Sequence, residues 1–149
     1  MDIKLETKTF DDEIARVLAE NPAKMEAAMK TILMYTVKQA QFHLDKNSSV
    51  ITSALKNHMA SSLETSVDSV TGRVGSNAAT ESGVQYAKFV EFGRGPVFPV
   101  NGKALKMEIG GKTIYRKSAK AAKAKPFLKP ALDDTALVIA DIVRESLAL

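Results

Sequence analysis

Histidine is the side chain most often used for acid–base chemistry near neutral pH, and this chain of 149 residues has two histidines and no cysteine. His43 lies on a predicted helical stripe that is mostly apolar, which is typical of a packing residue. His58 stands in a polar stretch with no carboxylate at metal-ligand spacing and no Gly-x-Ser-x-Gly motif. We therefore predict no catalytic residue and no metal ligand. The lack of cysteine also excludes thiolate sites.

The acidic residues give one candidate for an unusual charge. Three adjacent acids at 11–13 begin a predicted helix, where carboxylates ordinarily stabilise the helix dipole. Glu91 stands between two apolar neighbours, so we expect its carboxylate to be buried. The segment 93–95 lacks the Lys-Ser/Thr tail of a phosphate loop and indicates a tight loop. One carboxylate does not make a mechanism, and we predict a protein that is not an enzyme and holds no cofactor.

The charge of the chain is unevenly distributed. Its 21 Lys and Arg against 17 Asp and Glu give a net charge of +4. Between Lys103 and Lys129, nine basic residues stand against Glu108 alone, so this window carries +8 and the rest of the chain −4. We predict a flexible basic arm at about 103–129. The basic residues expected at a subunit or DNA contact are Arg94, Lys103, Lys112, Arg116, Lys117, Lys120, Lys123 and Lys125.

Three interpretations of the basic arm are open. It is a solvated loop that keeps the protein in solution, a nucleic-acid contact that neutralises phosphates, or an arm that contacts an acidic neighbour such as another copy of the chain. The segment 117–125 has no aromatic residue on which a base could stack, and sequence-specific base readout is the least expected role. Composition does not separate the three.

Length and hydropathy indicate a folded globular protein. With 45% hydrophobic and 26% charged residues, 149 residues predict a single domain, 1–149. The longest apolar run, 136–140, is far shorter than the roughly 18 residues that a bilayer span requires. The first residues have neither the basic nor the apolar region of a secretory signal. We expect synthesis and residence in a cytoplasm and no membrane partner.

Apolar periodicity predicts three main helices and a set of strands between them. The helices cover about residues 10–20, residues 23–46 and a C-terminal stretch from near residue 128, with a weaker helical pattern at 52–59. A half-exposed strand is predicted at 63–67. The dipeptide Thr71-Gly72 is expected to turn it back into a second strand, 73–75.

The clearest strand signal is a hairpin of two alternating arms, 105–109 and 112–116, around a two-glycine turn. Its register pairs Met107 with Ile114, Glu108 with Thr113 and Lys106 with Tyr115, and leaves one face to be buried. An edge strand is expected at 97–100, and a solvated loop, or a segment ordered by a partner, at 116–125. The element order predicts an α+β fold, with a long N-terminal helix and a C-terminal helix packed on one side of a small antiparallel sheet.

Two motifs about thirty residues apart are more distinctive than any single residue. They read Tyr86-Ala87-Lys88-Phe89-Val90-Glu91-Phe92-Gly93 and Lys125-Pro126-Phe127-Leu128-Lys129-Pro130-Ala131-Leu132, and Thr52-Ser53-Ala54-Leu55-Lys56-Asn57-His58 precedes them. In this order the three segments resemble a family of small neck or tail-completion proteins of long-tailed bacteriophages, also called minor tail or head-tail joining proteins. The resemblance covers roughly residues 20–147. Arg94 stands where the family usually has Thr, and Ser53 and Lys56 replace a Gly and an Arg.

The resemblance implies a structural protein of the virion. Copies of such a protein would form a homo-oligomeric, hexameric ring in the neck or at the head-proximal end of the tail, in contact with neighbouring neck and tail proteins and around the channel through which DNA passes. It would be made in the host bacterial cytoplasm. Whether the ring is a connector, a tail-completion ring or a tail terminator stays open. The alternative from composition is a small basic module that binds nucleic acid non-specifically as a monomer or dimer.

The residues of the two motifs also predict structural roles of their own. Apolar side chains beside a glycine are typical of a segment that anchors a loop to a core, and prolines stiffen the entry to a helix. The core and loop anchors are predicted to be Tyr86, Phe89, Val90, Glu91, Phe92 and Gly93, and the residues that dock the last helix Pro126, Phe127, Leu128 and Pro130. Function would then lie in the surfaces that they hold, the loop 94–102 and the basic arm.

Overall fold

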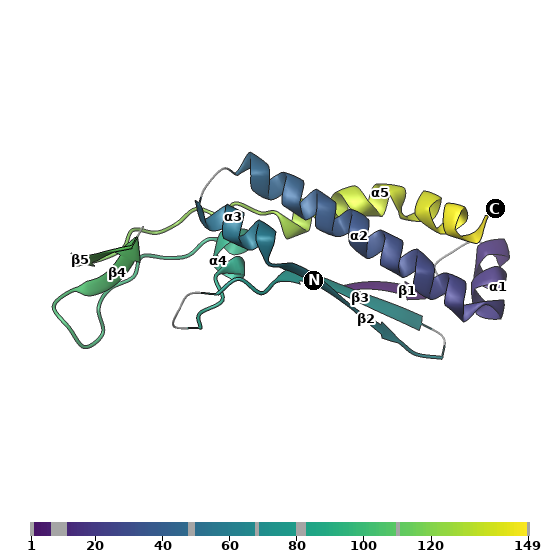
Figure 1. The fold of residues 1–149 in the computed structure, drawn as a ribbon, viewed down its shortest axis with the longest axis horizontal. Coiled ribbons are helices and arrows are strands. Elements are labelled where there is room, and N and C mark those ends of the chain that lie inside the picture. The colour runs from purple at the N-terminus through teal and green to yellow at the C-terminus, as the bar shows by residue number, and fades with distance from the viewer. Residues whose placement is uncertain are drawn as a thin grey trace. The chain divides into compact units, whose positions relative to one another are not determined.

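A computed structural model describes residues 2–6, 12–47, 50–67, 69–79, 83–109 and 111–148. The chain divides into two compact units, which we call the body (Met1–Ala87 with Pro126–Leu149) and the ribbon (Lys88–Lys125). The elements labelled in Figure 1 are β1 (Asp2–Glu6), α1 (Asp12–Glu20), α2 (Pro22–Lys46), α3 (Val50–Asn57), β2 (Met59–Thr65), β3 (Ser69–Ser76), α4 (Ala87–Phe92), β4 (Leu105–Ile109), β5 (Lys112–Arg116) and α5 (Leu128–Leu147).

The long helix α2 forms where the apolar periodicity predicts it. Asn21 caps its N-terminus, since the Asn21 side-chain oxygen accepts a hydrogen bond of 3.3 Å from the backbone N–H of Lys24, and Pro22 occupies the first helical position. Its buried stripe is Met25, Ala28, Met29, Ile32, Leu33, Thr36, Ala40 and Leu44. The stripe is wide enough to contact both the sheet and α5.

The body contains a three-stranded antiparallel sheet in the order β1-β3-β2. Val70 and Val74 of β3 are buried in the same core cluster as residues of α2. Between them, a Cβ atom on Gly72 would lie 2.6 Å from Leu33 Cδ2 and 2.8 Å from Met29 Sδ, so the glycine allows the helix to approach the sheet closely. The predicted turn at Thr71-Gly72 is therefore wrong, because this dipeptide lies inside one continuous strand.

The chain reverses between β2 and β3 at serines instead. The backbone N–H of Ser66 donates a hydrogen bond of 2.8 Å to the carbonyl oxygen of Ser69, and the two hydroxyl oxygens lie 2.6 Å apart. The resulting antiparallel pair runs from Met59 opposite Ser76 to Thr65 opposite Val70. β1 pairs with the other edge of β3 and was not predicted, although Ile3 and Leu5 alternate with charged residues.

The C-terminal helix α5 packs along α2 through apolar and polar contacts (Figure 1). The hydroxyl oxygens of Thr36 and Thr135 lie 2.9 Å apart, and both side chains are buried. Further along the two helices, Nε2 of His43 lies 2.7 Å from a carboxylate oxygen of Asp134. His43 is mostly buried in this contact, which agrees with its predicted packing role. The predicted α+β class is confirmed, with both long helices in the body and small antiparallel sheets.

The ribbon is a two-stranded antiparallel structure. Its hairpin β4–β5 has the predicted register, with Met107 opposite Ile114, Glu108 opposite Thr113 and Lys106 opposite Tyr115. Nearer the ends of the ribbon, backbone hydrogen bonds join Arg94 with Ala122 (2.9 Å in both directions) and Val97 with Ala119 (2.9 and 2.8 Å). In the segment 116–125, predicted as a solvated loop or a segment ordered by a partner, most residues after the end of β5 are exposed, and two backbone bridges pair it with Arg94 and Val97. In the predicted edge strand 97–100, Val97 alone forms a bridge.

Candidate functional site

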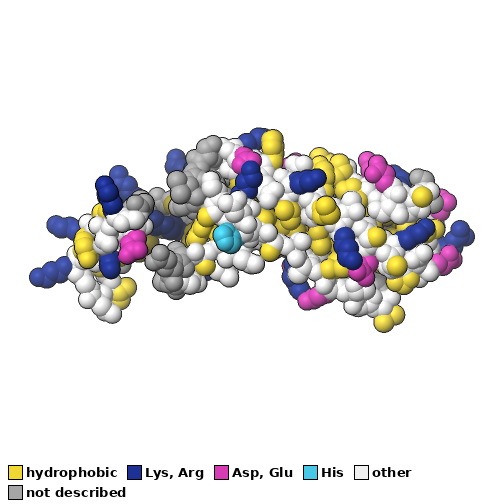
Figure 2. Space-filling view, viewed as in Figure 1, with side chains coloured by type: hydrophobic (Ala, Val, Ile, Leu, Met, Phe, Trp, Pro, Cys, Tyr) yellow, Lys and Arg dark blue, Asp and Glu magenta, His cyan; other side chains and the backbone are white. Residues whose placement is uncertain are grey.

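The ribbon holds all the basic residues that the sequence marked as contact candidates. It has ten Lys and Arg against two Glu, a net charge of +8, whereas the body has eleven against fifteen, a net charge of −4. The division of the chain into two compact units thus coincides with its division into a basic part and an acidic part. The ribbon differs from the predicted arm, 103–129, at both ends. It begins earlier, at Lys88, and it ends before Lys129, which belongs to α5. There the ammonium of Lys129 lies 2.7 Å from a carboxylate oxygen of Asp133. Figure 2 shows Lys and Arg side chains gathered around the hairpin β4–β5.

Seven cations of the ribbon lack a carboxylate partner among the described residues, whereas several cations of the body have one. Within the described part of the chain, no Asp or Glu oxygen lies within ion-pair distance of Lys103, Lys106, Lys112, Arg116, Lys117, Lys120 or Lys123. In the body, by contrast, Lys56 lies 2.7 Å from Asp45 and Lys30 lies 2.8 Å from Glu26. These seven positive charges therefore have no described carboxylate partner in a single copy, and an anionic surface would bind them.

The ribbon also exposes large apolar side chains. Val100 is 93% exposed, Phe92 77%, Tyr115 67% and Phe98 64%, and Val97 is exposed as well. The one residue classed as buried among the described residues of the ribbon is Glu91. The described residues of the ribbon therefore include no buried apolar side chain, and backbone hydrogen bonds join its two sides.

The first motif lies at the start of the ribbon, and the structure supports an anchoring role for most of it. Tyr86, Phe89 and Val90 are half-buried and Glu91 is buried as predicted, whereas Phe92, the last residue of α4, is exposed, so its prediction as a core anchor is wrong. The carbonyl oxygen of Val90 accepts a hydrogen bond of 2.7 Å from the N–H of Lys125. This bond joins the two ends of the ribbon.

At Gly93 the two sides of the ribbon lie close together. Its φ of +76° lies in the left-handed region, and a Cβ atom would lie 2.8 Å from Ala122 O and 2.8 Å from Ala124 N. A side chain at this position would separate the two strands where the ladder begins. The glycine of the motif is thus required by the return strand, whose partners lie about thirty residues away in the sequence.

The second motif belongs to the body and docks α5. Phe127 has no exposed surface, and Leu128 and Pro130 are half-buried in the first turn of α5, as a docking role requires. Pro126 is exposed and acts through its restricted backbone. The motif fixes the chain at the point where it re-enters the body.

Sequence reasoning did not single out the exposed apolar residues of the ribbon as contact candidates. Phe98 and Val100 lie in the predicted edge strand and Tyr115 lies in the predicted hairpin, so the sequence predicts a sheet position for each of them. A signal for their exposure is present in the sequence. Phe98 and Val100 are large apolar residues in a segment whose prolines, Pro96 and Pro99, cannot donate the backbone hydrogen bonds of a sheet.

The described residues were searched for a metal site and for a membrane-spanning helix. In the ranges that the structure covers, no three His, Asp or Glu side chains come together in a way that could hold a metal ion. None of the helices described there combines the length and apolar character that a bilayer crossing needs. In comparisons with known proteins, no family model, no curated protein and no solved structure matches the chain.

Proposed function

We propose that the chain is a structural protein of a tailed-phage virion whose copies form a ring in the neck or at the head-proximal end of the tail. The ring joins head to tail and lets DNA pass. The observation that carries the proposal is the ribbon. Its described residues include no buried apolar side chain, it exposes aromatic side chains and seven cations without a described carboxylate partner, and the other unit of the chain is acidic. Such a unit is built to be completed by a neighbour.

The structural roles of the two motifs support this proposal. Gly93 and the bond between Val90 and Lys125 fix the base of the ribbon, and Phe127 fixes the start of α5. The motifs that resemble those of the neck and tail-completion family therefore hold the frame of the subunit. The surfaces between the motifs would contact other copies and neighbouring neck and tail proteins.

The proposal is tested on virions. Purified particles of the phage that carries this sequence should contain the chain in a fixed number of copies, and electron microscopy should locate it as a ring between the portal and the tail tube. A chain that is absent from virions, or that lies in the capsid shell, would overturn the proposal. An amber mutation in its reading frame should give filled heads that lack tails, whereas normal infectious particles would contradict it.

A second candidate is a small module that binds nucleic acid non-specifically, and the seven lysines and arginines without ion pairs favour it. Such cations bind DNA phosphates and release counterions, so the logarithm of the binding constant falls steeply with the logarithm of salt concentration. Duplex binding measured against salt, together with particle mass from light scattering, separates the two. Steeply salt-dependent binding by a monomer favours the module, and ring-sized particles with weak DNA affinity favour the virion protein.

A further inference from the structure

We infer that the ribbon is a docking arm for a second copy of this chain, whose acidic body covers its exposed apolar side chains and pairs with its free cations. This contact would be the one that closes the ring, and in this respect alone the inference rests on the proposed function. Self-association through the ribbon is measurable without a virion, so the two can fail separately.

The apolar side chains decide between a protein partner and DNA. Phosphate binding needs cations and does not bury valine or phenylalanine, yet Phe98 and Val100 are about two-thirds and nine-tenths exposed, and Phe92 is also exposed. Clusters of exposed aromatic and apolar residues mark protein contacts. Met107 and Ile114, which face each other across the hairpin, are also only half-buried in one copy.

Charge selects a copy of the same chain as the protein partner. The ribbon carries +8 and the body −4, so the net charges of the two units have opposite signs. Among the described carboxylates of the body, those of Asp12, Glu13 and Glu145 make no ion pair. Asp12 and Glu13 begin α1 and Glu145 lies in the last turn of α5, and Figure 1 shows α1 and the C-terminal end of α5 at the same end of the body.

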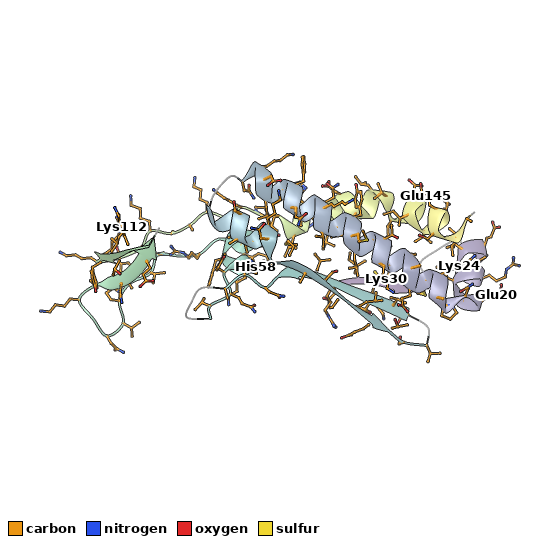
Figure 3. The ribbon with its side chains drawn as sticks, in the orientation of Figure 1. Glu20, Lys24, Lys30, His58, Lys112 and Glu145 are labelled. Carbon is orange, nitrogen blue, oxygen red and sulfur yellow. The ribbon has the colours of Figure 1, made fainter. Side chains whose placement is uncertain are left out.

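Figure 3 shows the two kinds of charge on their elements. Glu20 of α1 and Glu145 of α5 lie toward one end of the body, and Lys112 projects from the hairpin of the ribbon. Because the basic surface and the acidic surface are different parts of one chain, each copy can donate a ribbon to one neighbour and accept a ribbon from another. A contact of this heterologous kind continues from copy to copy until it closes as a ring.

The apolar half of the contact is tested by replacing two exposed side chains. Phe98→Ser together with Val100→Ser should weaken self-association at least about tenfold in analytical ultracentrifugation, since central apolar residues dominate interface affinity. Val67→Ser is the matched control, because Val67 is fully exposed on the body. The control should associate like the unaltered chain. All variants should keep its circular-dichroism spectrum and unfolding midpoint, because the replaced side chains are outside the core.

The charged half is tested by matched charge reversals. Lys117→Glu with Lys120→Glu should weaken association about tenfold or more, whereas Lys24→Glu with Lys38→Glu makes the same change of net charge on the body and should not weaken it. Adding Glu13→Lys and Glu145→Lys to the ribbon reversal should restore association to within about threefold of the unaltered chain, because opposite charges then face each other again. Association should also weaken as salt rises, since these charges are exposed.

Three results would overturn the inference. One is a chain that stays monomeric at all concentrations. Another is a Phe98/Val100 variant or a Lys117/Lys120 variant that associates normally. The third is a ribbon reversal that abolishes duplex DNA binding and leaves association intact, which would make the ribbon a nucleic-acid contact. If copies dock through the ribbon but virions lack the chain, the proposed function fails and this inference stands. If the chain forms the neck ring with the Phe98/Val100 variant, the reverse holds.

Discussion

Phenylalanine has opposite surroundings in the body and in the ribbon. Phe127 at the start of α5 has no exposed surface, whereas Phe98 in the ribbon is exposed over most of its side chain. Cations differ in the same way, since Arg73 on the sheet lies between Asp2 and Glu64 and Lys117 has no described carboxylate near it. In the body, Phe127 and Arg73 thus have their partners within one copy of the chain. The two sides of the ribbon are joined by backbone hydrogen bonds, and Phe98 and Lys117 are exposed on it.

The largest expected effect is a matched replacement of the two phenylalanines. Phe127→Ala should lower the free energy of unfolding by about 3–5 kcal/mol, because it empties a fully enclosed site in the body. Phe98→Ala should change it by less than about 0.5 kcal/mol, because its side chain contacts little in one copy. Urea unfolding at a concentration where the chain is monomeric measures both. Equal losses would show that the ribbon has a core of its own and would break the comparison.

A smaller effect is expected from alanine at the base of the ribbon. Gly93→Ala forces a Cβ atom against the return strand at a left-handed φ, which costs about 1–3 kcal/mol. Hydrogen exchange at the amides of Arg94 and Ala122 should therefore speed up about tenfold or more, while amides of α2 keep their protection. Gly95→Ala is the control, since a Cβ atom there meets nothing within 4 Å. Faster exchange across α2 would show that the two units unfold together.

The smallest effect is expected from an exposed cation of the body. The hydrogen bond and charge of Glu64, with a further contribution from Asp2, raise the pKa of Arg73. A raised pKa of a base means that the fold favours its charged form, so this contribution is present at neutral pH and is lost only in strong alkali. Arg73→Gln should lower the unfolding midpoint slightly at low salt and not at high salt, because exposed ion pairs are screened.

Lys117→Gln provides the contrast for that measurement. Its ammonium has no described carboxylate partner, so removing its charge should leave the unfolding midpoint unchanged or raise it at low salt, where like charges in the ribbon repel each other. Differential scanning fluorimetry at two salt concentrations compares the two variants. A larger loss for Lys117→Gln than for Arg73→Gln would contradict the division into a paired body and an unpaired ribbon.

Local signals in the sequence predicted the elements that form by local rules. Helix α2 follows from its apolar stripe and its Asn-Pro start, and the hairpin β4–β5 follows from two alternating arms around adjacent glycines, with its register correct to the residue. Burial of Phe127 and Glu91 also follows from their apolar neighbours in the sequence.

Non-local pairing accounts for what the sequence did not reveal. Gly72 has the same local signature as a turn glycine, and only the approach of Leu33 and Met29 from α2 shows that it is a strand glycine under a helix. The Lys- and Ala-rich segment 116–125 has no alternation of its own, and its order depends on partners at 94–97. The exposure of Phe92 follows from its place as the last residue of α4.

The chain leaves the body at Lys88 and returns to it after Lys125, and the hydrogen bond between Lys125 and Val90 joins these two ends of the ribbon. Inserting one residue in each strand beyond Val97 and Ala119 would therefore carry the tip about 3.3 Å further from that bond and leave the buried residues of the body in register. The length of the ribbon can thus change independently of the fold of the body. Under the docking that we propose, chains with the same body would span gaps of different width.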